Sequence, residues 1–382
     1  DYWFTIEPYV FIGMTDKQAL LYNTLDGTTI ETDKDEVIKL LQEMLQNENC
    51  GVVLLTNERY IQKDVNNFIQ SIREKYVGDI IDVTLSKAKP VQLFPYFNFP
   101  NKLYLYRKNN ISPVKNVTVN LSEISIHVNP LTNITKLISF LQTIPGTPSF
   151  NIIGNIEEIS NYVEFLSFFN QHMSPKNIMC SYKSVIALQP DCNNNFSYSI
   201  SVDFPVDMQL WNYSQQLLQN QNLPVEYVFD ISSENDSHQV DQFVELFQIK
   251  EYSLNPLYTG DNLCFFEKNV FLTREDILST RMTIKDFFSR QAIIIYDFGK
   301  INIMPNGDVY ANLNYPLLGN IYTQNIYEIV TKELKEGNSW FRIRNQAPCN
   351  SCVFQWLCPS PSNYEIVIGR PNLCHVKNKP MK

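Results

Sequence analysis

Four cysteines near the C-terminus constrain this chain more than any other feature. Three of them form the pattern C-N-S-C-V-F-Q-W-L-C, and the fourth follows in the segment P-N-L-C-H. They are Cys349, Cys352, Cys358 and Cys374, and they make up half of the chain's 8 cysteines. Two cysteines separated by two residues bind one metal centre from a single tight turn, and two further thiolates complete a set of four. The pattern predicts a C-terminal domain organised around one metal site.

Composition narrows the possible partners and the location. The 382 residues carry 31 Lys and Arg against 40 Asp and Glu, which gives a formal net charge of -9. The basic residues are scattered, whereas a nucleic-acid backbone requires a grouped positive surface, so we expect no nucleic-acid partner. No apolar stretch approaches the roughly 18 residues that span a bilayer. We expect a cytoplasmic protein whose remaining cysteines are buried, reduced thiols. Whether residues before Asp1 were removed stays open.

Residues 1–95 predict a small module of strands and helices. Tyr2–Met14 and Ala19–Tyr22 are rich in aromatic and aliphatic residues and indicate strands, followed by a tight turn at Asp26-Gly27. Apolar residues at helical spacing predict amphipathic helices over 37–45 and 62–76, with a short buried strand at 51–56 between them. A small sheet with helices behind it resembles a winged-helix module. A proline-rich linker is predicted over 87–100.

Residues 96–290 alternate between strand and helix patterns. The predicted strands cover 123–128, 149–154, 177–181, 197–204, 224–231 and 251–257. The predicted helices cover 134–142, 156–171, 206–219 and 238–247. Alternation with apolar strands indicates an α/β fold in which helices cover the outer face of a parallel sheet. About six such units predict a partial (β/α)6 barrel rather than a closed barrel of eight.

Residues 291–382 form the third predicted part, which contains the cysteines. Strands are predicted over 292–297, 300–303 and 309–312, with turns at Phe298-Gly299 and at Pro305-Asn306-Gly307-Asp308. An amphipathic helix over 326–335 then leads to Trp340 and the cysteine segment.

A partial barrel followed by C-x2-C-x5-C and a distal cysteine resembles a radical S-adenosylmethionine (SAM) enzyme with a SPASM extension. In that family the extension binds two auxiliary 4Fe-4S clusters. Cys349, Cys352 and Cys358 match the C-x2-C-x5-C segment, and Cys374 matches the final cysteine. The resemblance implies that these four residues ligate the outer auxiliary cluster in a SPASM-like domain.

The family's inner auxiliary cluster has lost its ligands in this chain. The pattern that begins at Gly307 ends at Asn312, where the family has cysteine, and the position four residues after Cys358 is Ser362. No cysteine lies between Cys264 and Cys349, so the first ligand is absent as well. The outer cluster's four cysteines are all present and the inner cluster's cysteines are all absent. This pattern indicates that the inner cluster was lost as a unit.

The radical SAM cluster also lacks its ligands. The family requires C-x3-C-x2-C in the loop after the first barrel strand, here residues 129–134, yet no cysteine occurs between Cys50 and Cys180. Three thiolates bind the iron cluster that cleaves SAM, and His or Asn does not replace their charge and softness. Gly154-Asn155-Ile156-Glu157 is a degenerate form of the family's Gly-Gly-Glu cofactor motif. We therefore expect no SAM cofactor.

These features together resemble the pseudo-radical-SAM proteins of ribosomal peptide (RiPP) maturation systems, of the GG-Bacteroidales type. The resemblance includes YWFTIEPYVFIG, ALLYNTLDG, VYANLNYPLLGNI, SWFRIR and CPSPSNYE. It implies two partners: a small precursor peptide and a radical SAM maturase with an intact active site.

The occupant of the four-cysteine site has two interpretations. One is a single 4Fe-4S cluster, which the resemblance implies, and the other is one structural zinc ion, which also takes four thiolates. Cysteine spacing does not separate them, because thiolate softness suits both metals.

The N-terminal module also resembles peptide-recognition elements, which add a leader peptide as a strand to a sheet edge. The predicted peptide-binding residues lie on one strand and one neighbouring helix: Val52, Val53, Leu54, Leu55, Val65, Phe68 and Ile69. The competing interpretation is that these side chains fill the core of the module.

A few other polar residues are candidates for catalysis or peptide binding. His127, Glu157 and Asp203 are the titratable residues expected near the carboxyl ends of the barrel strands, and they form no known motif. Arg342 and Arg344 alternate in W-F-R-I-R, where they either bind acidic peptide groups or form a solvated face, the interpretation that such an alternating pattern favours.

Two functions follow from this sequence. The first is a non-catalytic partner that binds the precursor peptide, the radical SAM maturase, or both. The alternative is a redox-active enzyme that uses the single remaining iron-sulfur cluster for electron transfer during peptide modification. The missing C-x3-C-x2-C motif favours the first.

Overall fold

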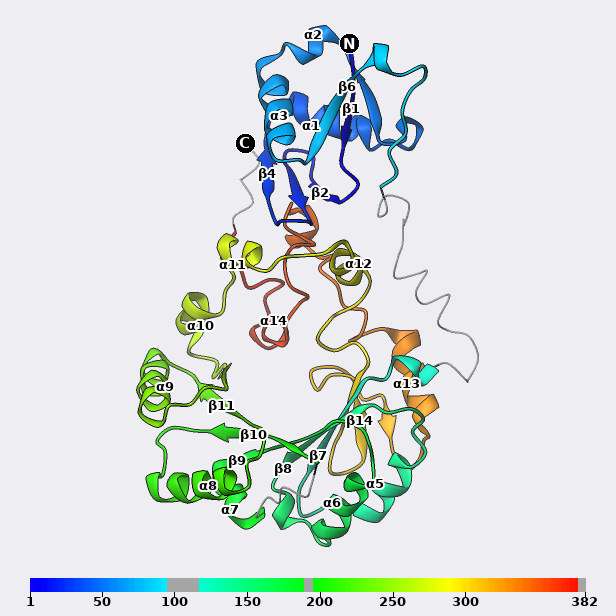
Figure 1. The fold of residues 1–382 in the computed structure, drawn as a ribbon. Coiled ribbons are helices and arrows are strands. Elements are labelled where there is room, and N and C mark those ends of the chain that lie inside the picture. Colours follow the sequence, from blue (N-terminus) through cyan, green and yellow to red (C-terminus); the bar gives the residue numbers. More distant parts are fainter. Residues whose placement is uncertain (95–116, 189–194, 377–382) are drawn as a thin grey trace.

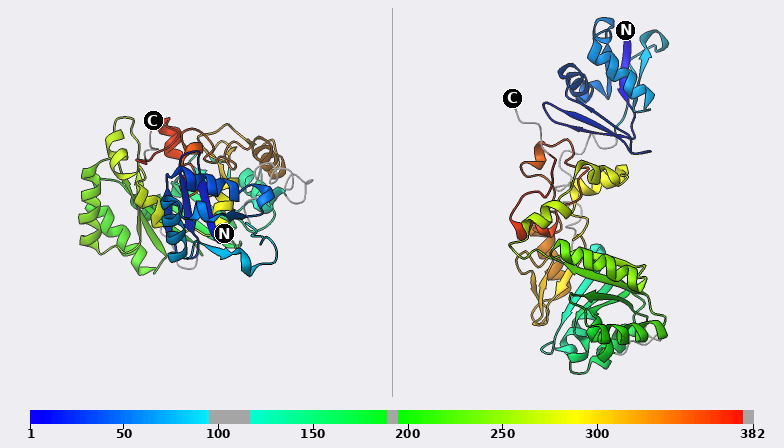
Figure 2. Two further views of the ribbon diagram at one scale, coloured as in Figure 1. Left: turned by 90° about the horizontal axis from the view of Figure 1, so that it is seen from above. Right: turned by 90° about the vertical axis from the view of Figure 1, so that its left-hand side faces the viewer.

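The computed structural model describes residues 1–94, 117–188 and 195–376, and its parts stack along one axis (Figures 1 and 2). The N-terminal module lies at one end, and a large sheet with its helices lies at the other. Helices α11, α12 and α14 lie between them. The C-terminal part of the chain therefore connects the two ends of the molecule.

The N-terminal module contains two small antiparallel sheets and two longer helices. Its elements are β1 (Tyr2–Ile6), β2 (Val10–Met14), β3 (Ala19–Asn23), β4 (Thr29–Thr32), α1 (Asp35–Met44), β5 (Val52–Leu55), α2 (Asn57–Tyr60), α3 (Lys63–Glu74) and β6 (Gly78–Asp82). The first sheet has the order β5-β1-β6 and the second the order β2-β3-β4. In the described residues, β4 and β5 are thus edge strands, each paired on one side only.

The module has its own hydrophobic core. Helices α1 and α3 present apolar faces that bury Leu41 and Ile72 against Phe4 of β1 and Val53 of β5. The predicted helices over 37–45 and 62–76 are confirmed by α1 and α3. Strands β4 (TIET) and β6 (GDIID) were not predicted, because polar residues interrupt both and conceal their strand pattern.

The large sheet begins with six parallel strands in sequential order. They are β7 (Glu123–Val128), β8 (Ser149–Gly154), β9 (Lys176–Ser181), β10 (Ser197–Val202), β11 (Val225–Ile231) and β12 (Tyr252–Pro256). Each overlaps a strand predicted from the sequence. Along β7 and β10, every second residue is buried, so one face of the sheet is apolar and the other carries residues such as Ser125 and Ser199.

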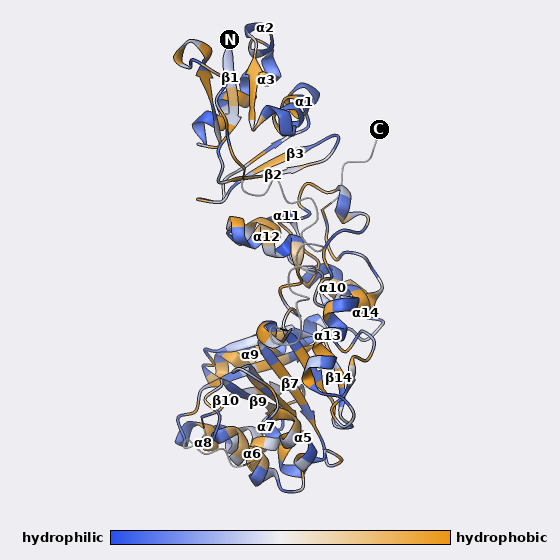
Figure 3. Ribbon diagram, turned by 90° about the vertical axis from the view of Figure 1, so that its right-hand side faces the viewer, coloured by the Kyte–Doolittle hydropathy of each residue, from blue (hydrophilic) through white to orange (hydrophobic). Residues whose placement is uncertain are grey.

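Helices follow the strands and cover one face of the sheet (Figure 1). They are α5 (Ile134–Leu141), α6 (Tyr162–Asn170), α7 (Tyr182–Leu188), α8 (Met208–Asn220) and α9 (Glu234–Phe247). Hydrophobic and hydrophilic stretches mix along these helices, as expected when one face packs on a sheet and the other faces solvent (Figure 3). The α/β class and the parallel sheet are therefore confirmed.

Residues after 299 add three strands to this sheet. They are β13 (Lys300–Ile303), β14 (Asp308–Tyr310) and β15 (Gly319–Asn320). Strand β13 is parallel to β7, and β14 and β15 continue antiparallel, which gives a nine-stranded mixed sheet. The C-terminal part thus shares a sheet with the middle part, while the predicted boundaries 1–95, 96–290 and 291–382 stay predictions.

The remaining helices connect the sheet to the cysteine segment. They are α10 (Leu263–Asn269), α11 (Arg274–Ser279), α12 (Ile284–Ala292), α13 (Ile326–Glu336) and α14 (Asn363–Ile368). No helix among the described residues is long and apolar enough to cross a membrane.

The predicted strand over 292–297 and the predicted burial of the remote cysteines were wrong. Residues 292–297 were predicted as a strand, but α12 ends at Ala292 and a helical turn follows, in which the Phe298 N–H donates to the Ile294 carbonyl at 3.0 Å. Within this apolar run Ile294 is buried, whereas Ile295 and Tyr296 are exposed on the turn, so the run does not form a paired strand. Cys50 and Cys264 were expected to be buried, yet both are exposed, and only Cys180 of the described remote cysteines is buried. Cys192 lies outside the described residues.

A buried carboxylate fastens α13 to the segment that leads to the cysteines. Glu333 is 1% exposed, and its Oε1 accepts the N–H groups of Ser339 at 2.9 Å and Trp340 at 2.7 Å. Burial raises the pKa of Glu333, although the Trp340 and Ser339 N–H groups oppose that shift. Protonated Glu333 therefore stabilises the folded state. This contribution to the free energy of unfolding is complete below the ordinary pKa of 4.5, and it is lost as the pH rises through the raised pKa of the folded state.

We expect Glu333→Gln to keep the acceptor and to remove this pH dependence. The free energy of unfolding of Glu333→Gln, relative to the wild type, should rise between pH 5 and pH 8 in denaturant titrations. Glu333→Ala is the contrasting variant, because it leaves two buried N–H groups without an acceptor at a cost of about 1–3 kcal/mol each at every pH. A relative stability of Glu333→Gln that falls with pH would contradict the assigned shift.

Candidate metal centre

The backbone brings the first three cysteines into consecutive turns. A 3-10 turn, η5 (Cys349–Ser351), closes when the Cys352 N–H donates to the Cys349 carbonyl at 3.1 Å. The next turn closes when the Cys358 N–H donates to the Phe354 carbonyl at 2.9 Å. This segment has no long apolar run, so turns rather than a helix or strand are the expected local structure.

A short pairing with the segment before α11 positions the fourth cysteine. Cys374 forms an isolated parallel bridge with Leu272. The Leu272 N–H donates to the Leu373 carbonyl at 3.0 Å, and the His375 N–H donates to the Leu272 carbonyl at 2.9 Å. The imidazole Nε2 of His375 lies 2.6 Å from the Glu267 carbonyl oxygen, so this side chain is engaged away from the cysteines.

All four cysteines line one narrow cavity of about 30 Å³. Two polar groups on its wall lie beside sulfur atoms. The Asn372 amide Nδ2 lies 3.0 Å from the Cys374 Sγ, and the Arg344 Nη1 lies 3.9 Å from the Cys349 Sγ. Such donors stabilise thiolate charge and orient metal ligands. All four cysteines are free of disulfides.

The electrostatics of the cavity oppose free thiolates. Burial raises the pKa of Cys358 to about 12, against the attraction of Arg344, and burial also raises the pKa of Cys349 and Cys352. Without a metal these thiols therefore stay protonated at neutral pH. A metal with affinity for soft ligands displaces the protons, since thiolate is the form that ligates. The chemistry of these side chains and their hydrogen-bond partners thus suits a thiolate-bound metal, whereas their arrangement does not gather them around one ion among the described residues.

The four side chains are not gathered around one point. No group of three or more His, Cys, Asp or Glu side chains in the described ranges is arranged to hold a single metal ion. The shared cavity is therefore an observation, while metal binding by the four cysteines stays a prediction.

Polar side chains occupy the positions where the resemblance places ligands of an inner cluster. The Asn312 amide donates to Asp297 Oδ2 at 2.8 Å and to Asn363 Oδ1 at 2.6 Å, and Asn363 follows Ser362. The Ser339 hydroxyl donates to the same Asp297 oxygen at 3.1 Å. Asn312, Asp297 and Ser339 are buried and satisfy one another by these hydrogen bonds, whereas Asn363 is exposed.

The predicted peptide-binding residues lie mostly inside the N-terminal module. Six of the seven are buried in it: Val52, Val53, Leu55, Val65, Phe68 and Ile69. Only Leu54 is exposed, at 42%. The linker also reaches the start of β5, because the Gln92 N–H donates to the Cys50 carbonyl at 2.9 Å. The six buried side chains would contact a peptide only if the module opened. Pairing of a peptide strand with the backbone of β5 stays a prediction.

The polar residues of the sheet do not form one constellation. His127 Nε2 lies 3.2 Å from Asn302 Oδ1, and Asp203 forms an exposed ion pair with Lys183 at 3.5 Å. Glu157 has a buried oxygen without a hydrogen-bond partner. Among the described residues no hydrogen bond or ion pair joins His127, Glu157 and Asp203, so they form no assembled acid–base set.

The expectation of a solvated face at Arg342 and Arg344 was wrong. Arg344 is 8% exposed, and its Nη2 pairs with Glu365 Oε1 at 2.8 Å. Arg342 is half-buried, and its Nη2 donates to the Pro361 carbonyl at 2.8 Å. Residues 341–344 are irregular rather than a strand, so the two guanidinium groups do not alternate toward solvent.

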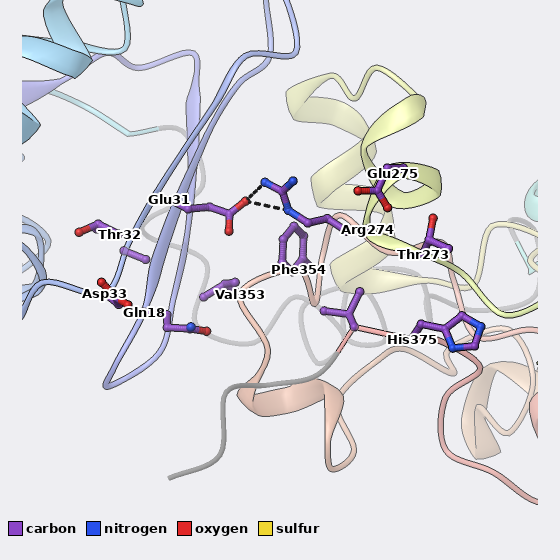
Figure 4. Close-up of a pocket in the computed structure, with 12 residues that line it drawn as sticks. Gln18, Glu31, Thr32, Asp33, Thr273, Arg274, Glu275, Val353, Phe354 and His375 are labelled. Carbon is purple, nitrogen blue, oxygen red and sulfur yellow. Dashed lines mark hydrogen bonds and ion pairs between the residues drawn. The ribbon is translucent and has the colours of Figure 1, made fainter. Parts of the chain in front are cut away.

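A large cleft, for which the sequence carries no local signal, lies between the N-terminal module and the cysteine segment (Figure 4). The cleft has a volume of about 590 Å³. One wall consists of Gln18, Ala19 and the end of β4, and the opposite wall consists of residues 273–275 of α11 with its N-cap, Val353, Phe354, His375 and Val376. The Glu31 carboxylate of β4 accepts from Arg274 Nε at 3.2 Å across the cleft. Phe354 and Val376 also line the cysteine cavity, so the two sites share a wall.

Comparisons with known proteins leave the family unassigned. No protein-family model matches the chain, and no curated protein matches it. Similar solved structures include SuiB of Streptococcus suis bound to S-adenosylmethionine, at 12% identity and a TM-score of 0.35, with 97% of this chain and 98% of that chain covered. Native anSMEcpe with bound AdoMet and Kp18Cys peptide has 13% identity and a TM-score of 0.44, over 62% of this chain and 88% of that chain. At these TM-scores the likenesses carry no argument about function.

Proposed function

We propose that this protein is a non-catalytic pseudo-radical-SAM partner in ribosomal peptide maturation, and that it binds the precursor peptide in the cleft beside β4. The observation that carries the proposal is the cleft itself, which an edge strand borders and which spans about 590 Å³. An edge strand offers main-chain groups to an added strand, and the opposite wall offers contacts for side chains. This replaces the buried helix face as the site of side-chain recognition.

Charge favours a peptide segment with Lys or Arg in the cleft. Glu31, Asp33 and Glu275 line it, and Arg274 is already paired with Glu31. A basic peptide residue would gain attraction to this surface, whereas an acidic one would be repelled. The radical SAM maturase is the second proposed partner, and it would supply the chemistry for which this chain lacks cysteine ligands.

The proposed metal role is to fix the wall that the cleft shares with the cysteine cavity. Two features bear on the identity of the metal. One tetrahedral zinc requires sulfur atoms about 3.8 Å apart, given zinc–sulfur bonds of about 2.3 Å, and the cysteines are not gathered in that way. A 4Fe-4S cluster takes each thiolate on a different iron and so suits dispersed sulfurs.

The small volume of the cavity favours zinc instead, because a cavity of about 30 Å³ is small for an iron-sulfur cluster. We propose the cluster, with widening of the loop on binding, and retain one structural zinc as the alternative. We further propose that the parallel sheet and its helices form a partial barrel that does not bind SAM.

Binding of the labelled precursor peptide, measured by fluorescence anisotropy, tests the proposal. We expect Glu275→Lys in the cleft to weaken binding about five- to tenfold through one reversed charge. Glu58→Lys is the matched control, because it makes the same charge change on the exposed helix α2. If pull-downs with this protein retain neither the precursor peptide nor the radical SAM maturase, the proposal is overturned.

A further inference from the structure

A second cavity adjoins the cysteine segment and concentrates positive charge. It has a volume of about 380 Å³, and its lining includes Arg342, Arg344, Arg370, Glu365 and Tyr315. Three guanidinium groups and one carboxylate give this lining a formal charge of +2, in a chain with a net charge of -9. Such a local excess of positive charge in an acidic protein is typical of an anion-binding site.

Two of the three guanidinium groups already have carboxylate partners. Arg344 pairs with Glu365 at 2.8 Å, and both side chains are only 7% exposed. Arg370 pairs with Glu267 at 3.1 Å, with both side chains about 40% exposed (42% and 41%). These pairs hold the walls in place. Among the described residues of this lining, Arg342 is the guanidinium without a carboxylate ion pair, although Glu365 also attracts it and it hydrogen-bonds the Tyr315 hydroxyl.

Arg342 is held in position but incompletely bonded. Its Nη2 donates to the Pro361 carbonyl at 2.8 Å, and its guanidinium carbon lies 5.7 Å from the centroid of the Tyr315 ring. Its Nε is buried without a hydrogen-bond partner, and no ion pair joins it to a carboxylate of the described residues. A buried guanidinium N–H without an acceptor is costly, so a bound acceptor would stabilise this arrangement.

The neighbouring phenol adds a neutral donor. Burial raises the pKa of Tyr315, against the opposing effect of Arg342, so its hydroxyl keeps its proton at neutral pH. A hydroxyl and a guanidinium fork side by side suit the two oxygens of one carboxylate. Phosphate, with its higher charge, is usually bound by several free cations or backbone N–H groups. In the part of this cavity that the structure describes, Arg342 is the guanidinium that has no carboxylate ion pair.

We propose that the cavity between Tyr315, Arg342 and Arg370 is a binding site for a carboxylate, held by the guanidinium of Arg342. Its volume lies in the range of small-ligand pockets and has room for one or two amino-acid residues. Ile343 and Ile366 provide apolar walls beside the charged group. The carboxylate belongs either to an acidic residue of a peptide or to a small free acid. The site is separate from the cleft beside β4, and its success or failure does not depend on the proposed function.

Calorimetric titration of the full chain tests the site with four probes. They are acetyl-Gly-Glu-Gly-amide, acetyl-Gly-Gln-Gly-amide, sodium acetate and inorganic phosphate. We expect the Glu peptide to bind at least about tenfold more tightly than the Gln peptide. Stronger binding of the Glu peptide than of acetate would assign the site to peptide carboxylates, and equal binding would assign it to small acids; both outcomes support a carboxylate site.

The variant Arg342→Lys keeps the charge but removes the fork, and we expect it to weaken carboxylate binding at least about tenfold. Arg73→Lys is the matched control, because Arg73 is exposed and lies in the N-terminal module. If Arg342→Lys does not fold, protection of Arg342 from phenylglyoxal by the Glu peptide gives the same answer in the wild type. Equal binding by Arg342→Lys and wild type, tighter binding of phosphate, no protection, or no binding of any probe would overturn the proposal.

Discussion

Replacing Cys358 by alanine is expected to abolish metal binding. Anaerobically purified wild type should contain about four irons and four sulfides per chain and absorb broadly near ~400 nm, whereas Cys358→Ala should lose the band and most of the iron. The reason is local: Cys358 lines the cavity with the other three cysteines, and its turn is fixed by the bond to the Phe354 carbonyl. Three remaining thiolates do not complete the ligand set.

The matched control for this experiment is Cys264→Ala. Cys264 is an exposed cysteine on α10 and does not line the cavity, so this variant should keep the full metal content. One zinc per chain and no colour in the wild type would replace the cluster by the structural-zinc alternative. Full metal content in Cys358→Ala would contradict the four-cysteine site for either metal.

Replacing Arg344 by alanine is expected to have the largest effect on stability. The Arg344 guanidinium pairs with Glu365, donates to the Pro359 carbonyl at 2.5 Å and lies beside the Cys349 sulfur. Burial raises the pKa of Glu365, and Arg344 is the largest of the influences that oppose this shift, ahead of Arg342 and the Ser362 N–H. Removing Arg344 leaves a buried carboxylate without its counter-charge, and breaking one partner of such a pair costs about 3–5 kcal/mol.

A double variant distinguishes the effect of the buried charges on the unfolding free energy from the effect of side-chain packing. Arg344→Met with Glu365→Met removes both charges and keeps similar volume, so we expect much less loss of unfolding free energy in denaturant titrations than in Arg344→Ala. Arg370→Ala is the surface control: its pair with Glu267 is 42% and 41% exposed, and such pairs contribute at most about 1 kcal/mol. Equal losses in Arg344→Ala and Arg370→Ala would contradict the buried-pair interpretation.

The sequence predicted the large sheet well because its strands are apolar and bounded by polar turns. All six parallel strands, β7 to β12, overlap their predicted ranges. Helix α6 was predicted to begin at Ile156 but begins at Tyr162, because Asn161 adopts a left-handed φ of 64° before it. Short elements that pair only in three dimensions, such as β4 and β6, carry too little local pattern to be predicted.

The candidate sites bring together residues that are distant in the sequence, and only one of them has a sequence pattern that predicts it. Cysteine spacing predicted a shared metal site, and the structure brings all four cysteines to one cavity. The cleft is different, because β4, α11 and Phe354 are far apart in the chain and meet only after folding. The burial of Arg344 was also not predictable, since its partner Glu365 lies 21 residues away on α14.

In the proposed function, this chain binds a peptide without modifying it. The most direct measurement is mass spectrometry of the precursor peptide after anaerobic incubation with this protein alone, SAM and a reductant. We expect a bound peptide of unchanged mass and no 5′-deoxyadenosine, because no cysteine lies between Cys50 and Cys180 to ligate a radical SAM cluster. A change in peptide mass, or formation of 5′-deoxyadenosine, would contradict it.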